Sequence, residues 1–196
     1  MANVSNQITR ILYKEIREGD LLKFKAVSNQ ADTGGGARDL RISPYGKFLP
    51  VVKLIFPDVV KEKRKRGGQQ VTQEIFKGQF CSKASDGNIK IEEVLFEPPT
   101  DARPTEGRIA TVSSYSCFQT SLEIKPNDKL FLLLIQKDDG VVWPYFFYES
   151  SFRKKGNWHA TVEKVLIECI ETKRAPGRAV MGYYDFTTQK GYCNGK

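Results

Sequence analysis

The sequence has very few of the residues that most often carry catalysis, since His159 is the single histidine among 196 residues. Ser-His-Asp and Cys-His mechanisms both need an imidazole as the base, so each would depend on this one residue. No cysteine or aspartate stands near it in the chain, where its neighbour is Trp158. We therefore predict a binding protein with no catalytic residues.

The four cysteines are widely scattered, and no two of them form a Cys-x-x-Cys pair. A structural zinc site needs closely spaced soft ligands, so we predict no metal site and no cofactor. In a chain of this length the pattern is typical of ordinary reduced thiols in a cytosolic protein. The four residues are Cys81, Cys117, Cys169 and Cys193.

Long hydrophobic runs are also missing. The longest one, residues 130–135, is far too short to cross a bilayer. Residues 1–10 are polar and lack the apolar segment of a secretory signal peptide. We expect a cytoplasmic protein that has no membrane partner.

Basic residues, in contrast, are abundant. Lys and Arg number 31 against 23 Asp and Glu, so the net charge is +8 and the isoelectric point about 9.3. Such a balance suits a polyanionic partner, because each neutralised phosphate releases counterions. The alternative is that the charge only keeps the protein in solution. The placement of the basic residues has to decide between the two.

With 40% hydrophobic and 28% charged residues, the composition is that of a globular protein. We predict one domain, 1–196, with a core at about 20–150 and a C-terminal helix and strand within 160–187. Turn residues and apolar periodicity predict strands separated by short turns, one of them a hairpin turn at 137–140. The expected strands are 21–27, 71–80, 89–96, 108–115, 129–136, 141–148 and 179–186.

Two segments have helical patterns. Residues 46–56 should form a short helix that Pro57 closes, with Pro50 confined to its first turn. Residues 161–172 place apolar side chains at helical spacing, although alternation also permits a strand there. The charged run 61–66 followed by Gly67 and Gly68 is expected to be a surface loop. The sum predicts an α+β fold, mainly β, in which strands close into a pseudobarrel with two short helices.

The first candidate binding segment is 31–41. Gly34, Gly35 and Gly36 allow close backbone approach to another molecule, and Arg38 and Arg41 follow with guanidinium groups that suit a nucleic-acid groove. No Gly-Lys-Ser/Thr sequence follows, which excludes a P-loop. A plain surface loop is the alternative.

The second candidate segment contains Arg103, Glu106 and Arg108 at the entry to a predicted strand. Arginine can donate two hydrogen bonds to guanine, and glutamate can accept one from cytosine. Alternation along a strand would place Glu106 and Arg108 on the same face. A surface ion pair of little energetic value is the alternative.

Taken together and in order, these segments resemble a known family. Asn29, the triplet 32–34, the following glycines, a helix ending at Phe56 and the Glu106-x-Arg108 pair resemble the N-terminal effector-binding domain of EcoRII-type restriction endonucleases. That domain is similar to the DNA-binding pseudobarrel of plant B-three transcription factors. The resemblance spans roughly 21–136. The run 61–66 and the segment after 157 have no counterpart in it.

The resemblance implies a domain that binds duplex DNA in the major groove through two arms. The implied setting is restriction–modification or phage defence, with a nuclease domain or subunit as a further partner. The base-reading candidates are Arg38, Arg41, Arg103, Glu106 and Arg108. The backbone-contact candidates are Lys23, Lys25, Gly34, Gly35, Gly36, Lys61, Lys63, Arg64, Lys65 and Arg66, and the outer footprint adds Lys154, Lys155, Lys173, Arg174 and Arg178.

Enzymatic alternatives remain open. Asp58 after Pro57, and Glu171 two residues before Lys173, spell a PD…ExK site, so a metal-dependent endonuclease is the main rival. However, more than a hundred residues separate the acids, and Glu171 ends a predicted helix where that motif needs a strand. The triplet 32–34 is also found in aspartic proteases, which would require a dimer of this chain.

Two further alternatives concern binding. The aromatic segments 143–148 and 183–186 could stack on unpaired bases, although alternation between the barrel core and a half-exposed face is favoured. A protein–protein module would need an exposed apolar patch, and the sequence does not show one clearly.

Overall fold

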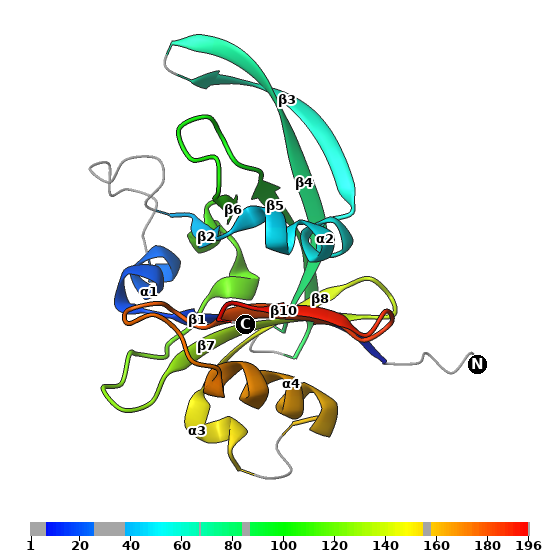
Figure 1. The fold of residues 1–196 in the computed structure, drawn as a ribbon. Helices are drawn as coiled ribbons and strands as arrows, with labels where there is room; N and C mark the ends of the chain where they lie inside the picture. The colour runs from blue at the N-terminus through cyan, green and yellow to red at the C-terminus, as the bar shows by residue number, and fades with distance from the viewer. Residues whose placement is uncertain (1–6, 26–37, 67, 84–86, 155–157, 196) are drawn as a thin grey trace, which may run out of the picture.

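The computed structural model describes residues 7–25, 38–66, 68–83, 87–154 and 158–195. The candidates Gly34, Gly35, Gly36 and Lys155 lie outside these residues. Within them the chain forms one ten-stranded sheet and four α-helices (Figure 1). The prediction of an α+β fold that is mainly β is confirmed, while the expected number of helices was too small.

The centre of the sheet is a set of antiparallel strands from both ends of the chain. β1 (Ile8–Ile16) lies between β7 (Leu130–Lys137) and β9 (Met181–Asp185), and β10 (Lys190–Cys193) pairs with β9. β8 (Val142–Tyr148) returns from β7 through the hairpin that the Asp-Gly turn predicted. The strands expected at 129–136, 141–148 and 179–186 are therefore confirmed.

The central strands are buried on both faces, which explains the unbroken apolar sequence of β7. Alternate residues of a strand point to opposite faces, and each face of this sheet has its own hydrophobic core. Leu132 lies in one core beside Leu12, and Leu133 lies in the other beside Tyr13. All four side chains are at most 2% exposed.

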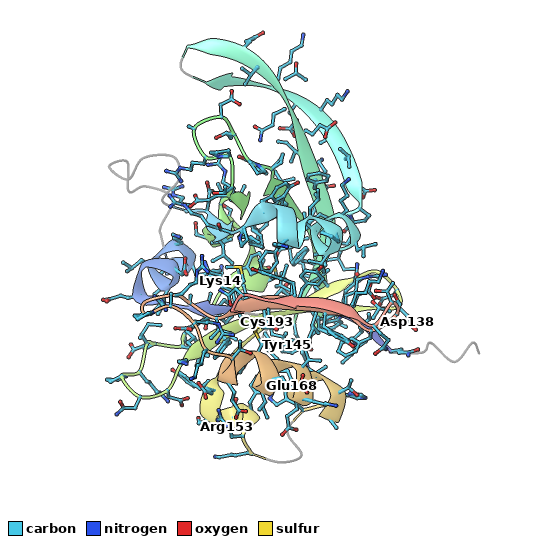
Figure 2. The ribbon with its side chains drawn as sticks, in the orientation of Figure 1. Lys14, Asp138, Tyr145, Arg153, Glu168 and Cys193 are labelled. Carbon is cyan, nitrogen blue, oxygen red and sulfur yellow. A yellow bond between two sulfur atoms is a disulfide. The ribbon has the colours of Figure 1, made fainter. Side chains whose placement is uncertain are left out.

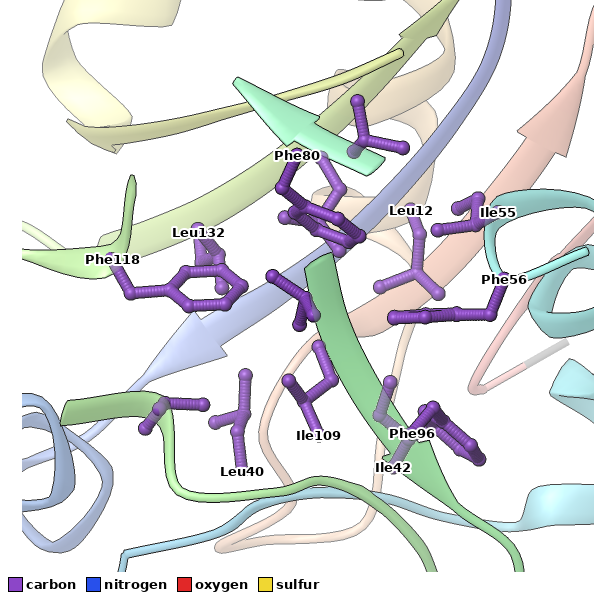
Figure 3. Packing of buried hydrophobic residues seen from close by; sticks show 14 of the residues in the cluster. Leu12, Leu40, Ile42, Ile55, Phe56, Phe80, Phe96, Ile109, Phe118 and Leu132 are labelled. Carbon is purple, nitrogen blue, oxygen red and sulfur yellow. The ribbon is translucent and has the colours of Figure 1, made fainter. Parts of the chain in front are cut away.

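The core that contains Leu12 and Leu132, called the upper core, is enclosed by the rest of the sheet, which curls over it (Figure 1). β8 connects to β4 (Gln69–Lys83), then to β5 (Ile89–Glu97), β6 (Gly107–Ile109) and β2 (Leu40–Ile42). Figure 3 shows Leu40, Ile42 and Ile109 pointing into this core together with residues of the central strands. Helices α1 (Glu18–Lys25) and α2 (Tyr45–Ile55) pack against the same core.

The other core, which contains Tyr13 and Leu133 and is called the lower core, is covered by α3 (Glu149–Phe152) and α4 (Ala160–Glu171). A disulfide between Cys169 and Cys193 joins α4 to β10, while Cys81 and Cys117 are buried free thiols. The expectation of four reduced thiols was therefore wrong for one pair, because distant cysteines meet where the last strand packs under α4. No helix in the described ranges has the length and apolar character that crossing a membrane requires.

Near the ends of the chain, one predicted element is wrong and two strands of the structure were not predicted. Residues 21–27 were expected to be a strand, but 18–25 form helix α1, which buries Leu21 and Phe24 one turn apart and leaves Leu22 exposed. Strands β1 and β10 were not predicted. β1 carries Lys14 and Glu15 among its buried residues, which hides its apolar pattern.

Other differences concern prolines and charges. Residues 61–66 are not a loop: they belong to β3 (Asp58–Arg66), which pairs with β4. Cross-strand hydrogen bonds to β4 stabilise this charged segment as a strand, although its composition does not predict one. Pro50 lies inside α2 rather than in its first turn, at an exposed position. β6 (Gly107–Ile109) overlaps the expected strand 108–115 only at 108–109, because a 3-10 turn follows at Val112–Ser114.

The remaining predicted elements are confirmed. α2 ends at Ile55 just before Pro57, and α4 resolves the ambiguity at 161–172 in favour of a helix. β4 and β5 form the hairpin expected from the turn signal between them. The helix pattern is decisive in α4 because Val162, Leu166 and Cys169 lie on one buried face.

Burial of β7 on both faces predicts that adjacent leucines are equally sensitive. Leu132→Ala and Leu133→Ala should each lower the free energy of unfolding by about 2–5 kcal/mol, because each leaves a cavity in a different core. Leu22→Ala is the control, since that side chain is 64% exposed and should change stability by less than about 0.5 kcal/mol. Urea denaturation measures all three, and a tolerated change at either core position would contradict the two-core arrangement.

The disulfide closes a loop across a sequence separation of 24 residues. Its reduction should lower the free energy of unfolding by about 3 kcal/mol through the entropy that the unfolded chain regains. Denaturation with and without a thiol reductant measures this difference. The Cys169→Ser/Cys193→Ser double variant should not respond to the reductant, and equal stability of the wild-type protein in both conditions would argue against the cross-link.

Candidate nucleic-acid interface

The described part of the first candidate segment is the short strand β2 with the two residues before it. Leu40 and Ile42 are buried in the upper core, so Arg41 between them points outward. β2 pairs with β6, and Arg41 lies directly opposite Arg108 in that ladder. The two predicted binding segments are thus neighbouring strands of one sheet edge, and the sheet positions their arginines.

β6 repeats the same pattern, with Ile109 buried and Arg108 partly exposed. Gly107 is required by packing, because a Cβ at this position would lie 2.5 Å from the Phe96 ring and 2.7 Å from the Tyr45 ring. The aromatic rings that exclude a side chain here are stacked on each other with their centroids 6.0 Å apart. This contact holds β6 close to the start of α2 and so fixes the positions of Glu106 and Arg108 at the surface.

Arg108 is held by two carboxylates. One of its terminal nitrogens lies 3.1 Å from Asp39 Oδ2, and its Nε donates to Glu97 Oε2 at 2.8 Å, with a second guanidinium nitrogen on the same oxygen. The Asp39 and Glu97 side chains are each only 4% exposed. Removing Arg108 from them would leave two buried charges without their cation, which is strongly unfavourable.

Glu106 lies between two more exposed arginines. Its Oε2 is 3.5 Å from Arg41 Nε and 3.9 Å from a terminal nitrogen of Arg103. Both arginine side chains are well exposed, 39% for Arg41 and 46% for Arg103. The Arg103 pair is exposed and long, so it contributes little to stability. Arg41 Nε and Glu106 Oε2 are themselves buried, and neither atom has a hydrogen-bond partner among the described residues, so this pair keeps hydrogen-bonding capacity for another partner.

The structure therefore brings four of the five predicted base-reading residues together. Arg41, Arg103, Glu106 and Arg108 line one small surface hollow with Pro98. The base-reading roles themselves stay predictions. The ion pairs favour a positioning role for Arg108 and leave Arg41, Arg103 and Glu106 as the side chains best able to meet a ligand.

The fifth residue, Arg38, is partly buried, and its carbonyl accepts a hydrogen bond from Val112 N at 2.9 Å. This contact anchors the end of the first segment to the residues after β6. The backbone candidates Lys23 and Lys25 lie at the C-terminal end of α1 rather than on a strand. Lys23 Nζ is 2.9 Å from Asp20, whereas Lys25 is exposed.

The basic run 61–66 lies on a two-stranded ribbon formed by β3 and the first half of β4. β3 pairs with no other strand among the described residues, and Figure 1 shows the ribbon projecting from the upper half of the molecule. Lys61 and Lys63 are exposed on it. The backbone of Arg64, Lys65 and Arg66 continues β3 to the tip, opposite 69–71.

Sequence reasoning missed Asp39 and Glu97, the two buried acids that hold Arg108. Glu97 lies directly opposite Arg108 in the β5–β6 ladder, and Asp39 also accepts a hydrogen bond from Thr111 N at 3.0 Å. Strand register across 11 and 69 residues of sequence brings these groups together. Glu97 directly follows the predicted strand 89–96, and Asp39 lies between Arg38 and Arg41 of the first candidate segment, but acidic residues in such places are too common to single out either position.

The nuclease alternative depends on Asp58 and Glu171. Asp58 begins β3 directly after α2, which packs on the upper core, whereas Glu171 ends α4 under the lower core. The sheet lies between them, and Glu171 is paired with Arg153 at 3.3 Å. In the described ranges, no group of three His, Cys, Asp or Glu side chains is arranged to hold a metal ion.

The aromatic and histidine candidates have structural partners. Trp158 stacks on Phe152 with ring centroids 4.7 Å apart, and Phe147 packs against both. His159 is the N-cap of α4, where its Nδ1 accepts a hydrogen bond from Thr161 N at 3.4 Å. In the segments 143–148 and 183–186, Phe147 is buried, Tyr145 is 40% exposed and the other aromatic side chains are partly buried, which agrees with the expected alternation between a core and a half-exposed face.

Comparison with known protein families, curated proteins and solved structures finds no match for this chain. The resemblance to the EcoRII-type effector-binding domain therefore stays a prediction.

Loss of the Arg108 side chain should destabilise the fold. Arg108→Ala removes the cation that the buried Asp39 and Glu97 share and should lower the free energy of unfolding by about 3 kcal/mol. Arg103→Ala, in the same hollow but exposed, should change it by less than about 0.5 kcal/mol. Urea denaturation compares the two, and equal stabilities would mean that Arg108 is as dispensable to the fold as Arg103.

Proposed function

We propose that this protein binds duplex DNA in the major groove. The observation that carries the proposal is the convergence of Arg41, Arg103 and Glu106 at one sheet edge, next to a strand pair that holds them in register. Guanidinium and carboxylate groups held this way match the donors and acceptors that G·C pairs present in that groove.

Charge and shape support the same proposal. The protein carries a net charge of +8, and five of the six residues in 61–66 are basic. A two-stranded β-ribbon is one of the elements that the major groove can admit. The ribbon of β3 and β4 supplies basic side chains for the phosphates, while the hollow at the β2–β6 edge supplies side chains for the bases.

In this proposal the free protein keeps its reading residues occupied by one another. Glu106 pairs with both Arg41 and Arg103 at 3.5 and 3.9 Å. DNA replaces these two ion pairs, neither of which is a hydrogen bond, with bidentate hydrogen bonds to guanine, and Glu106 turns to cytosine N4. Arg108 remains with Asp39 and Glu97 and keeps β6 in place.

The proposed setting is cytoplasmic restriction–modification or phage defence, in which the curled sheet serves as a DNA-binding pseudobarrel. Such a domain would direct a nuclease domain or subunit to its target. The support is the order of the two arginine-bearing segments and their meeting on one face. The endonuclease alternative is less favoured, because Asp58 and Glu171 belong to opposite sides of the sheet.

Duplex affinity should fall steeply with salt concentration, because phosphate contacts release counterions. Arg103→Ala should cost about 1–3 kcal/mol of binding free energy on the preferred sequence and relax its discrimination. Lys63→Ala should weaken all sequences alike and reduce the salt slope by about one. Fluorescence anisotropy across a salt series, with a selected duplex and a random one, measures these effects.

Lys164→Ala is the matched control, since Lys164 is an exposed lysine on α4, on the far side of the sheet from the hollow. It should leave affinity and salt slope unchanged. A weak, salt-independent interaction of the wild-type protein with every duplex would refute DNA binding. Equal effects of Lys63→Ala and Arg103→Ala on both duplexes would remove the division between phosphate and base contacts.

A further inference from the structure

A groove of about 450 Å³ lies beside the candidate interface, on the other side of Arg41. Its walls come from α1, from the junction of β2 and α2, from the loop before β6 and from the segment leading into β9. Volumes of 300–1,000 Å³ are usual for small-molecule sites. The lining residues are Lys14, Asp20, Arg41, Ser43, Pro44, Thr105, Arg178, Ala179, Met181 and Asn194.

Lys14 is the unusual residue of this groove. Leu12 and Ile16, two positions away on either side of β1, lie in the upper core, so alternation assigns Lys14 to a position that an apolar residue would normally fill. Its side chain is only 8% exposed. Figure 2 shows Lys14 beside α1 on the upper side of β1. A lysine is rarely buried this far unless it is paired.

The ammonium group of Lys14 has protein partners, but they leave an excess of positive charge. Its Nζ lies 2.9 Å from Asp20 Oδ2 and donates to Arg41 O at 3.1 Å. Asp20 is shared with Lys23 at 2.9 Å. Burial lowers the pKa of Lys14 despite Asp20, and the charges of Lys23 and Arg41 lower it further. An additional anion near Nζ would relieve this imbalance.

The rest of the groove is suited to an anion with oxygen atoms. Arg178 is exposed, and no carboxylate in the described ranges pairs with it. The hydroxyls of Ser43 and Thr105 likewise have no hydrogen-bond partner within those ranges. Asp20 is the one acidic side chain in the lining, and it is already engaged by two lysines.

The wall that carries Arg178 is firmly held. Asn194 accepts a hydrogen bond from Met181 N at 2.9 Å and donates one to Ala179 O at 2.7 Å. Arg174 donates to the same side chain at 3.0 Å. A rigid wall loses little entropy when a ligand binds, so the groove is organised before its ligand arrives.

We propose that this groove binds the phosphate group of a nucleotide, with Lys14 and Arg178 as its cationic ligands. The phosphate has two sources: a free mononucleotide, or a strand of DNA whose neighbouring base meets Arg41. The second source rests on the proposed function, and the first does not. Charge-assisted hydrogen bonds from lysine and arginine are the usual means of holding phosphate.

Isothermal titration of the full chain tests the site with three probes: inorganic phosphate, deoxyadenosine monophosphate and a short duplex. Arg178→Ala is the main variant, because an exposed side chain can be removed without loss of the fold. It should weaken the probe that uses the groove about tenfold, the effect of one charge-assisted hydrogen bond. Lys164→Ala should leave all three affinities unchanged.

If Arg178→Ala loses affinity for the mononucleotide and for phosphate, a free nucleotide is supported as the ligand. This conclusion holds even if the wild-type protein does not bind the duplex, so failure of the proposed DNA binding does not affect it. Loss of duplex affinity alone supports a DNA phosphate. Unchanged affinity for every probe overturns the site. Lys14→Met adds a second test with a thermal melt to confirm folding: a folded Lys14→Met variant that binds like wild-type would also overturn it.

Discussion

Burial of the central strands on both faces is the constraint on which the rest of this structure depends. β1 and β7 send alternate side chains into two separate cores, and each core needs its own cover. The lower core is closed by α3 and α4 and cross-linked to β10 through Cys169. The upper core is closed when the sheet curls, so β2 and β6 must sit at its rim.

The candidate interface follows from the position of β2 and β6 at the rim of the upper core. Short strands with one arginine between buried residues can only point the arginine outward, and the β2–β6 register then sets Arg41 opposite Arg108. Arg108 is engaged by two buried acids and stabilises the edge. Arg41 and Arg103 form ion pairs with Glu106 that lack a hydrogen bond, so one cluster contains a structural part and a part with hydrogen-bonding capacity left over.

The proposed DNA surface and the proposed phosphate groove meet at Arg41, whose side chain borders both. On one side lie Arg103 and Glu106, and on the other lie Lys14 and Arg178. The groove draws its wall from the C-terminal segment, which the predicted domain treated as an addition to the core. β9 pairs with β1, so this segment is part of the same sheet and contributes to the same side of the molecule.

Local pattern alone determined much of the fold. The apolar run of β7, the Asp-Gly hairpin into β8, the helical spacing in α4 and the two arginine-bearing segments could all be predicted from neighbouring residues, because alternation, turn chemistry and helix periodicity act over a few positions. The strand nature of β1 and of 61–66 could not, since Lys14, Glu15 and the basic run have compositions that only a distant partner strand can accommodate.

The features of the candidate site also divide into those that the sequence predicts and those that only the tertiary structure decides. The residue types at 41, 103, 106 and 108 pointed to a polyanion from the sequence alone. Tertiary structure decided which arginine is engaged by Asp39 and Glu97, which two share Glu106, and that Lys14 and Arg178 face one groove. Charges interact through space over a few ångströms. Their pairing is therefore set by strand register and packing between residues far apart in the chain.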